Sequence, residues 1–270
     1  MRKAIIYLCV FIAVQIFMTY IVQTVWLMVE GMEVGRALQT TLAGTATISV
    51  PMLIVSSAVY SIVLLIIFLK TGWSKVSPNY LRTHPWAVLF WCAIAALGTI
   101  IPSLWLQEKM PLPNIMENEF NGVLSSPWGY PTICIFAPVV EELIFRGAVL
   151  RALMEGFGNT KNHWLPIFIS ALLFALIHIN PAQMPHAFLL GLLLGWMYVR
   201  TGSIIPGIMV HWVNNTVAYV GFNLLPRASE MELIDFFGTP TRILIAVALS
   251  LCCILLPALW QLHQRMKSCD

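Results

Sequence analysis

The segment A-P-V-V-E-E-L-I-F-R-G, which runs from Ala137 to Gly147, places two adjacent glutamates and an arginine inside a long apolar stretch. Ionisable residues are rare in membrane-spanning helices because they are costly to bury there, and those that are present usually serve a function. The segment therefore raises two questions. One is whether the surrounding chain spans a membrane, and the other is which side chains would balance these charges.

Composition answers the first question. The 270 residues are 59% hydrophobic and only 10% charged, and their mean hydropathy is +0.82. A soluble domain carries about 25% charged residues, so this composition predicts a polytopic membrane protein. The net charge of +3 reflects cationic loops and does not suggest a nucleic-acid partner. The six cysteines show no C-x-x-C pattern, so we expect neither a disulfide framework nor a structural zinc site.

Apolar segments of about 20 residues are typical of membrane-spanning helices. The first segment follows Met-Arg-Lys but is too long for a signal peptide, so we expect it to remain as a helix. The chain shows no internal repeats, and residues 1–270 are predicted to form a single transmembrane domain. The fold class predicted is all-α, a polytopic transmembrane bundle of about eight helices, at 4–29, 41–69, 85–106, 127–154, 164–180, 186–200, 203–225 and 243–262.

The distribution of Lys and Arg between loops predicts orientation, because cytoplasmic loops are enriched in these residues. With the N-terminus inside, ten cationic residues fall in inside segments and four, Arg36, Lys109, Arg227 and Arg242, fall outside. We therefore predict an integral membrane protein with both termini cytoplasmic, in the cell membrane if the source is prokaryotic. The ten inside residues are Arg2, Lys3, Lys70, Lys75, Arg82, Arg151, Lys161, Arg200, Arg265 and Lys267.

Helical spacing separates the three intramembrane charges. Glu142 and Arg146 are four residues apart with the acid first, which is the favourable order for an ion pair on one face. Glu141 is turned about 100° away from Glu142 and cannot easily share Arg146. We therefore expect a structural pair, Glu142 with Arg146, and a separate carboxylate, Glu141, that is available as a general base.

Two further helices carry polar residues at a comparable predicted depth. One reads F-A-L-I-H and ends on His178, and another reads H-W-V-N-N with His211 and Asn215 on one face. If these groups meet Glu141, the inventory suits acyl-group hydrolysis by an activated water. The same donors also suit one divalent metal, in which case Glu141, His178 and His211 would hold a zinc ion. No H-E-x-x-H motif is present, and a cofactor is left open.

The chain resembles a known family at these residues. E-E-L-I-F-R matches the EExxxR motif of the CPBP family, also called the CAAX-protease and bacteriocin-processing or Abi family. F-A-L-I-H matches its FxxxH motif, and H-W-V-N-N matches its HxxxN/D motif. The three motifs occur in the family's order on separate predicted helices. The resemblance covers the catalytic motif core, about 127–225.

The resemblance implies an eight-helix intramembrane endopeptidase similar to type II CAAX prenyl endopeptidases, acting on a membrane-associated or lipidated protein or peptide. It implies that Glu141 activates water with assistance from His178. It also implies that His211 and Asn215 stabilise the oxyanion, and that Glu142 and Arg146 support the site. The family has been described both as glutamate-dependent and as metal-dependent. The expected partners are the lipid bilayer and the membrane-bound substrate.

The same polar residues would also suit functions that involve no proteolysis. The charges could form a structural salt network or line an ion pathway, as in a transporter. A bacteriocin self-immunity protein or an inactive protease would use the same polar core for binding. We expect His186 to be a helix-start residue, with a place at the mouth of the site as the alternative, and Asn214 to form an interhelical hydrogen bond. Gly191 and Gly195 form a GxxxG pattern that favours close helix packing. The oligomeric state is not predicted.

Overall fold

The computed structural model describes residues 1–77, 79–158, 162–225, 227 and 230–267. About 79% of the chain is helical, and the described residues contain no strand. This confirms the predicted all-α membrane bundle. Lys161, counted above among the inside residues, lies outside the described residues. The five cysteines within them are free.

The eight predicted segments correspond to long helical stretches. They are α1 (Arg2–Val29), α3 (Val50–Lys70), α5 (Trp86–Lys109), a composite helix over 130–156, α9 (Trp164–Leu176), α10 (Met184–Thr201), α11 (Ile205–Leu224) and a composite helix over 240–265. Four of these are long and apolar enough to cross a membrane, namely Arg2–Val29, Val50–Lys70, Trp86–Lys109 and Pro240–Arg265. The chain is therefore a multi-pass integral membrane protein. Short helices complete the chain, α2 (Val34–Leu42), α4 (Asn79–Arg82), α6 (Glu117–Ser125) and α12 (Leu233–Phe237).

Two predicted boundaries were wrong. The segment 41–69 is not one helix, because α2 ends at Leu42 and α3 begins only at Val50. Gly44 adopts a left-handed backbone between them, with φ of +66°, and a helix cannot continue through that conformation. The segment 164–180 is also too long, since α9 ends at Leu176 and residues 177–183 form a turn before α10.

The composite helix over 130–156 alternates between α and π geometry. It consists of the π-helix η1 (Tyr130–Phe136), α7 (Ala137–Ile144), the π-helix η2 (Phe145–Leu150) and α8 (Arg151–Gly156). Segments of π-helix are rare in proteins as a whole, but those that occur are often found at functional sites.

Three of the carbonyl groups of this composite helix accept hydrogen bonds from the segment after α3 and from α9. The Ser74 hydroxyl donates to the Leu143 carbonyl at 2.7 Å, and the Ser170 hydroxyl donates to the Phe145 carbonyl at 3.3 Å. The backbone N–H of Lys75 donates to the Gly147 carbonyl at 3.4 Å. These bonds come from the segment after α3 and from α9, and they hold the irregular helix in a defined register.

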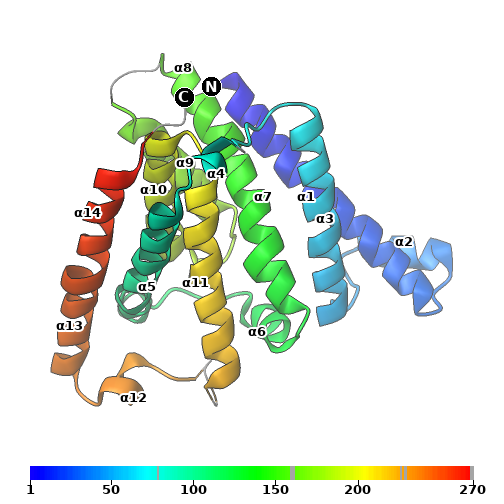
Figure 1. Ribbon diagram of the computed structural model, residues 1–270. Coiled ribbons are helices and arrows are strands. Elements are labelled where there is room, and N and C mark those ends of the chain that lie inside the picture. Colours follow the sequence, from blue (N-terminus) through cyan, green and yellow to red (C-terminus); the bar gives the residue numbers. More distant parts are fainter. Residues whose placement is uncertain (78, 159–161, 226, 228–229, 268–270) are drawn as a thin grey trace.

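The composite helix over 130–156 lies at the centre of the bundle (Figure 1). It packs against α3 and α1 on one side and against α11 and α9 on the other. The start of α1 and the end of α14 (Leu256–Arg265) lie at the same end of the bundle (Figure 1). This arrangement agrees with an even number of membrane spans, which places both chain ends on the same side. Which side of the membrane that end faces stays a prediction.

Candidate functional site

The ion pair expected between Glu142 and Arg146 is present at the centre of the bundle. Arg146 Nη1 donates to Glu142 Oε1 at 2.6 Å, and the two side chains are 1% and 0% exposed. The other terminal nitrogen of Arg146 donates to the Gly191 carbonyl at 3.3 Å, and the guanidinium lies 4.5 Å from the centre of the Phe174 ring. A buried guanidinium with this many partners is fixed in one position.

Two glycines make room for this pair. A Cβ atom on Gly207 of α11 would lie only 2.6 Å from Glu142 Oε2, so the carboxylate occupies the space that a side chain would fill. A Cβ atom on Gly191 of α10 would lie 3.0 Å from the Ala171 backbone of α9. The close approach of α9 and α10 confirms the packing role expected for the GxxxG pattern, and it brings the Gly191 carbonyl to Arg146.

Glu141 occupies a different environment from its neighbour. Its side chain is 21% exposed, whereas that of Glu142 is fully buried. Among the described residues, no hydrogen-bond donor reaches Glu141 Oε2, and the Nε2 of His211 lies 3.8 Å from it. Glu141 therefore has a carboxylate oxygen that is sheltered from solvent and free to accept a proton.

His211 of α11 lies between the two carboxylates. Its Nε2 faces Glu141, and its Nδ1 lies 3.5 Å from Glu142 Oε1. The imidazole is buried and meets the Phe174 ring edge to face, with ring centres 5.9 Å apart. The residue thus links the Glu142–Arg146 pair to the free carboxylate of Glu141.

His178 lies two residues beyond the end of α9. Its Nδ1 is 2.8 Å from the Phe174 carbonyl. A carbonyl only accepts hydrogen bonds, so this contact assigns the proton to Nδ1 and leaves Nε2 as the basic nitrogen. The imidazole packs edge to face against the Phe174 ring at 4.9 Å. Phe174 therefore contacts Arg146, His178 and His211, and it holds the three motifs together.

Asn215 is held by hydrogen bonds to η1 and to its own neighbour in α11. Its Nδ2 donates to the Ile133 carbonyl of η1 at 3.0 Å, and its Oδ1 accepts from Asn214 at 3.2 Å. Asn215 therefore joins α11 to the composite helix just before the motif glutamates. The interhelical bond expected of Asn214 is made instead by Asn215, while Asn214 supports it from the same helix.

Two residues near the site are absent from the predicted set. Tyr60 of α3 interacts electrostatically with Glu141, and its hydroxyl is hydrogen-bonded to Ser57 at 3.0 Å. His186 is at the start of α10 as expected, but it also interacts electrostatically with His178 and His211. A tyrosine in an apolar helix carries no signal in the sequence, whereas a position of His186 at the mouth of the site was considered from the sequence and ranked below a helix-start role.

His186 also borders a cavity. Its Nδ1 is hydrogen-bonded to the Ser103 hydroxyl of α5. Both residues line a cavity of about 260 Å³ between α5, α10 and the composite helix over 240–265, whose remaining walls are mostly leucine. The cavity therefore combines an apolar interior with a polar corner near the three histidines.

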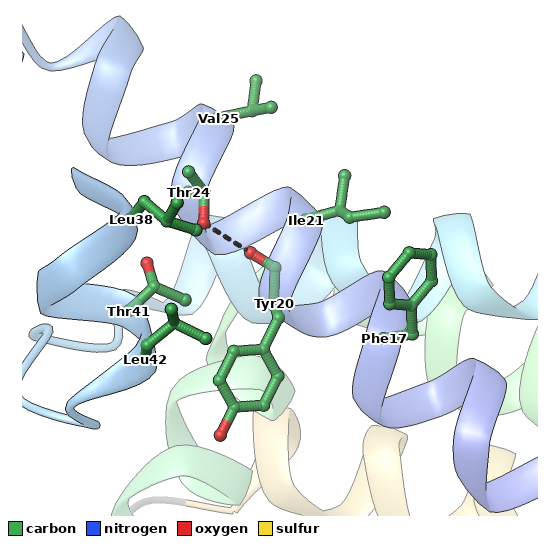
Figure 2. Close-up of a pocket in the computed structure, with 8 residues that line it drawn as sticks. All are labelled: Phe17, Tyr20, Ile21, Thr24, Val25, Leu38, Thr41 and Leu42. Atoms are coloured by element: carbon green, nitrogen blue, oxygen red, sulfur yellow. Dashed lines mark hydrogen bonds between the residues drawn. The ribbon is translucent and has the colours of Figure 1, made fainter. Parts of the chain in front are cut away.

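A larger groove lies away from these residues. It measures about 430 Å³ and runs between α1 and α2, with side chains such as Tyr20, Leu38 and Thr41 along its walls (Figure 2). Apart from the hydroxyl of Tyr20, the described residues that line it carry no ionisable group. The groove offers apolar surface and no group for catalysis, so volume alone does not identify the site.

The proposed metal ligands do not form a metal site in this arrangement. Within the part of the chain that the structure describes, no three His, Cys, Asp or Glu side chains are grouped closely enough to hold a metal ion. The predicted set of Glu141, His178 and His211 therefore does not fit a zinc ion as the side chains stand.

One family model matches part of the chain. Residues 123–217 match the model of the Type II CAAX prenyl endopeptidase Rce1-like family. The matched segment begins in α6, ends in α11 and contains all three motifs, which confirms the resemblance found in the sequence. No curated protein and no solved structure matches the chain. The match supports a protease of the CAAX type and gives no support to the transport or immunity alternatives.

Proposed function

We propose that this protein is an intramembrane endopeptidase that hydrolyses a peptide bond of a membrane-associated or lipidated protein or peptide. The observation that carries the proposal is the division between the two adjacent glutamates. Glu142 is neutralised by Arg146 at 2.6 Å, while Glu141 keeps a sheltered carboxylate oxygen without a hydrogen-bond donor among the described residues. A structural salt network has no need of the second acid, whereas hydrolysis needs a base.

In the proposed mechanism, Glu141 takes a proton from a water molecule. The resulting hydroxide adds to the carbonyl carbon of the scissile peptide and forms a tetrahedral oxyanion. Glu141 then returns the proton to the leaving nitrogen as the carbon–nitrogen bond breaks. A positioned carboxylate that moves protons in this way accelerates a reaction by about 10²–10⁴-fold.

His178 would assist the water from its free nitrogen. The bond from Nδ1 to the Phe174 carbonyl fixes the ring and leaves Nε2 able to accept a hydrogen bond from the attacking water. The contact between His178 and Phe174, with ring centres 4.9 Å apart, limits rotation of the imidazole. His178 would therefore orient the water while Glu141 takes its proton.

His211 and Asn215 would stabilise the oxyanion as hydrogen-bond donors. His211 is buried, and its ring nitrogens lie 3.8 Å from Glu141 Oε2 and 3.5 Å from Glu142 Oε1. One amide hydrogen of Asn215 is bonded to the Ile133 carbonyl, so the other remains for the substrate. No step is assigned to a metal ion, because the described donors do not fit one. The apolar cavity beside His186 suits a hydrophobic part of the substrate.

The test compares membranes that contain the wild-type protein with membranes that contain Glu141→Ala. We expect an uncleaved precursor to accumulate only in the variant, and purified Glu141→Ala to lose cleavage of that precursor while keeping its unfolding temperature. Glu155→Ala is the matched control, because it removes a half-exposed glutamate of the same composite helix. Full cleavage by Glu141→Ala would overturn the mechanism.

A further inference from the structure

The turn that carries His178 is unusual for a membrane protein. Helix α9 has 13 residues, which corresponds to about 20 Å, whereas the hydrocarbon core of a bilayer is about 30 Å thick. Residues 177–183 therefore form irregular backbone short of the membrane surface. Irregular backbone at that depth requires partners within the protein, because lipid cannot satisfy its polar groups.

The backbone of this turn is also strained. Ile179, the residue after His178, has φ of +59°. Left-handed backbone is disfavoured for residues with a branched Cβ atom, and it persists only where the surrounding structure enforces it. Some contact must therefore hold the chain in this conformation next to the imidazole.

Asn180 supplies that contact. It is 0% exposed and uses both ends of its amide. Its Nδ2 donates to Asn114 Oδ1 at 2.6 Å, and its Oδ1 accepts from the backbone N–H of Ile115 at 3.2 Å. Both partners belong to the loop between α5 and α6, which is distant in the chain. The loop and the turn are thus joined by two reciprocal hydrogen bonds.

We propose that Asn180 is a positioning residue, and that its two bonds to Asn114 and Ile115, termed the amide clamp, hold the strained turn so that His178 keeps its orientation. Asn180 does not touch the substrate. The inference rests on the proposed function, since it concerns how accurately His178 assists the attacking water. A displacement of about 1 Å in a catalytic group can reduce a rate by about 10²-fold.

Kinetics of single and double variants test the clamp. We expect Asn180→Ala and Asn114→Ala each to lower kcat by about 10- to 100-fold with little change in KM, and the double variant to be no worse than Asn180→Ala. Asn114→Asp keeps an acceptor for the Asn180 amide and should retain activity near that of the wild type. Asn223→Ala is the matched control, because its amide ties α11 to the Leu124 carbonyl without contacting the turn.

A second measurement does not depend on activity. Nitrogen NMR of ¹⁵N-labelled histidine reports which ring nitrogen of His178 carries the proton, with His178→Gln used to assign the signal. We expect a single form protonated at Nδ1 in the wild type and in Asn114→Asp, and a mixture in Asn180→Ala. Unchanged His178 resonances, or an unchanged kcat in Asn180→Ala, would overturn the clamp. An inactive wild-type protein would overturn the proposed function instead, and the spectra would still test the clamp.

Discussion

Two composite helices of this protein share an irregular backbone and differ in everything else. The helix over 130–156 contains η1 and η2, and the helix over 240–265 contains the π-helix η3 (Ser250–Leu255) between α13 (Pro240–Leu249) and α14. The first holds Glu141, Glu142 and Arg146 in its middle, whereas the second holds no Asp, Glu, Lys or Arg between Arg242 and Arg265. An irregular backbone is therefore not by itself a sign of a site.

The difference lies in what surrounds each helix. The carbonyls of the first accept bonds from the segment after α3, from α9 and from α11, and its charges contact α9, α10 and α11. In the second, the Ser250 hydroxyl donates to the Gly98 carbonyl at 3.1 Å, and Leu255 packs against that glycine. The π segment η2 lies in a helix that packs around charged groups, whereas η3 lies in a helix that packs against the apolar helix α5.

The sharpest test of this comparison removes one cation from each helix. Arg146→Met leaves Glu142 buried without its partner, so we expect the free energy of unfolding to fall by about 3–5 kcal/mol. Arg265→Met removes an exposed residue whose side chain bonds its neighbour Gln261, and we expect a change within about 0.5 kcal/mol. Thermal unfolding in detergent measures both. An equal fall in the free energy of unfolding for both variants would contradict the claim that only the first helix depends on a buried ion pair.

A smaller effect is expected from a single methyl group on α11. Gly207→Ala would push against Glu142 Oε2, and overpacking of this kind costs about 1–3 kcal/mol. We expect peptidase activity to fall at least about tenfold, because the Glu142 contact to His211 moves as well. In the same helix, Gly221→Ala meets open space and should stabilise the protein by about 0.5–1 kcal/mol. Activity assays and unfolding temperatures of the two variants give the answer, and a fully active Gly207→Ala would contradict the assigned packing.

The smallest effect is expected in the π segment of the second helix. Cys252 and Cys253 are exposed thiols in η3. The double substitution to Ala should change the free energy of unfolding by less than about 0.5 kcal/mol and leave kcat unchanged. A large loss of activity would show that the helix over 240–265 takes part in the site.

The fold could be predicted well from composition and hydropathy, because eight apolar segments leave few arrangements. The break before Val50 was missed because residues 41–49 carry no charge, although the threonines and serine around Gly44 favour a turn there. The early end of α9 was missed for a similar reason, as Ile177 and Ile179 are as apolar as the helix before them. Hydropathy indicates where a chain is buried and not where its helix stops.

The candidate site could be predicted in part. Spacing of four residues identified the pair of Glu142 and Arg146, because that contact lies within one helix. Gly207 and Asn180 could not be found, since their importance lies in which segment of another helix or loop they meet. The contact of Asn215 with the Ile133 carbonyl was likewise unpredictable, because it depends on how α11 is rotated against η1.

The π segments also bear on which genetic changes the site can tolerate. A π-turn accommodates one more residue than an α-turn, so the deletion of a single codon within η2 would restore regular α geometry. The residues that follow would keep their orientation, and the Arg151 side chain would keep its bond to the Trp73 carbonyl at 2.7 Å. The deletion of a codon within α7 would instead rotate the residues that follow by about 100°. In this helix, the π segments are therefore the places where a change of length is best tolerated.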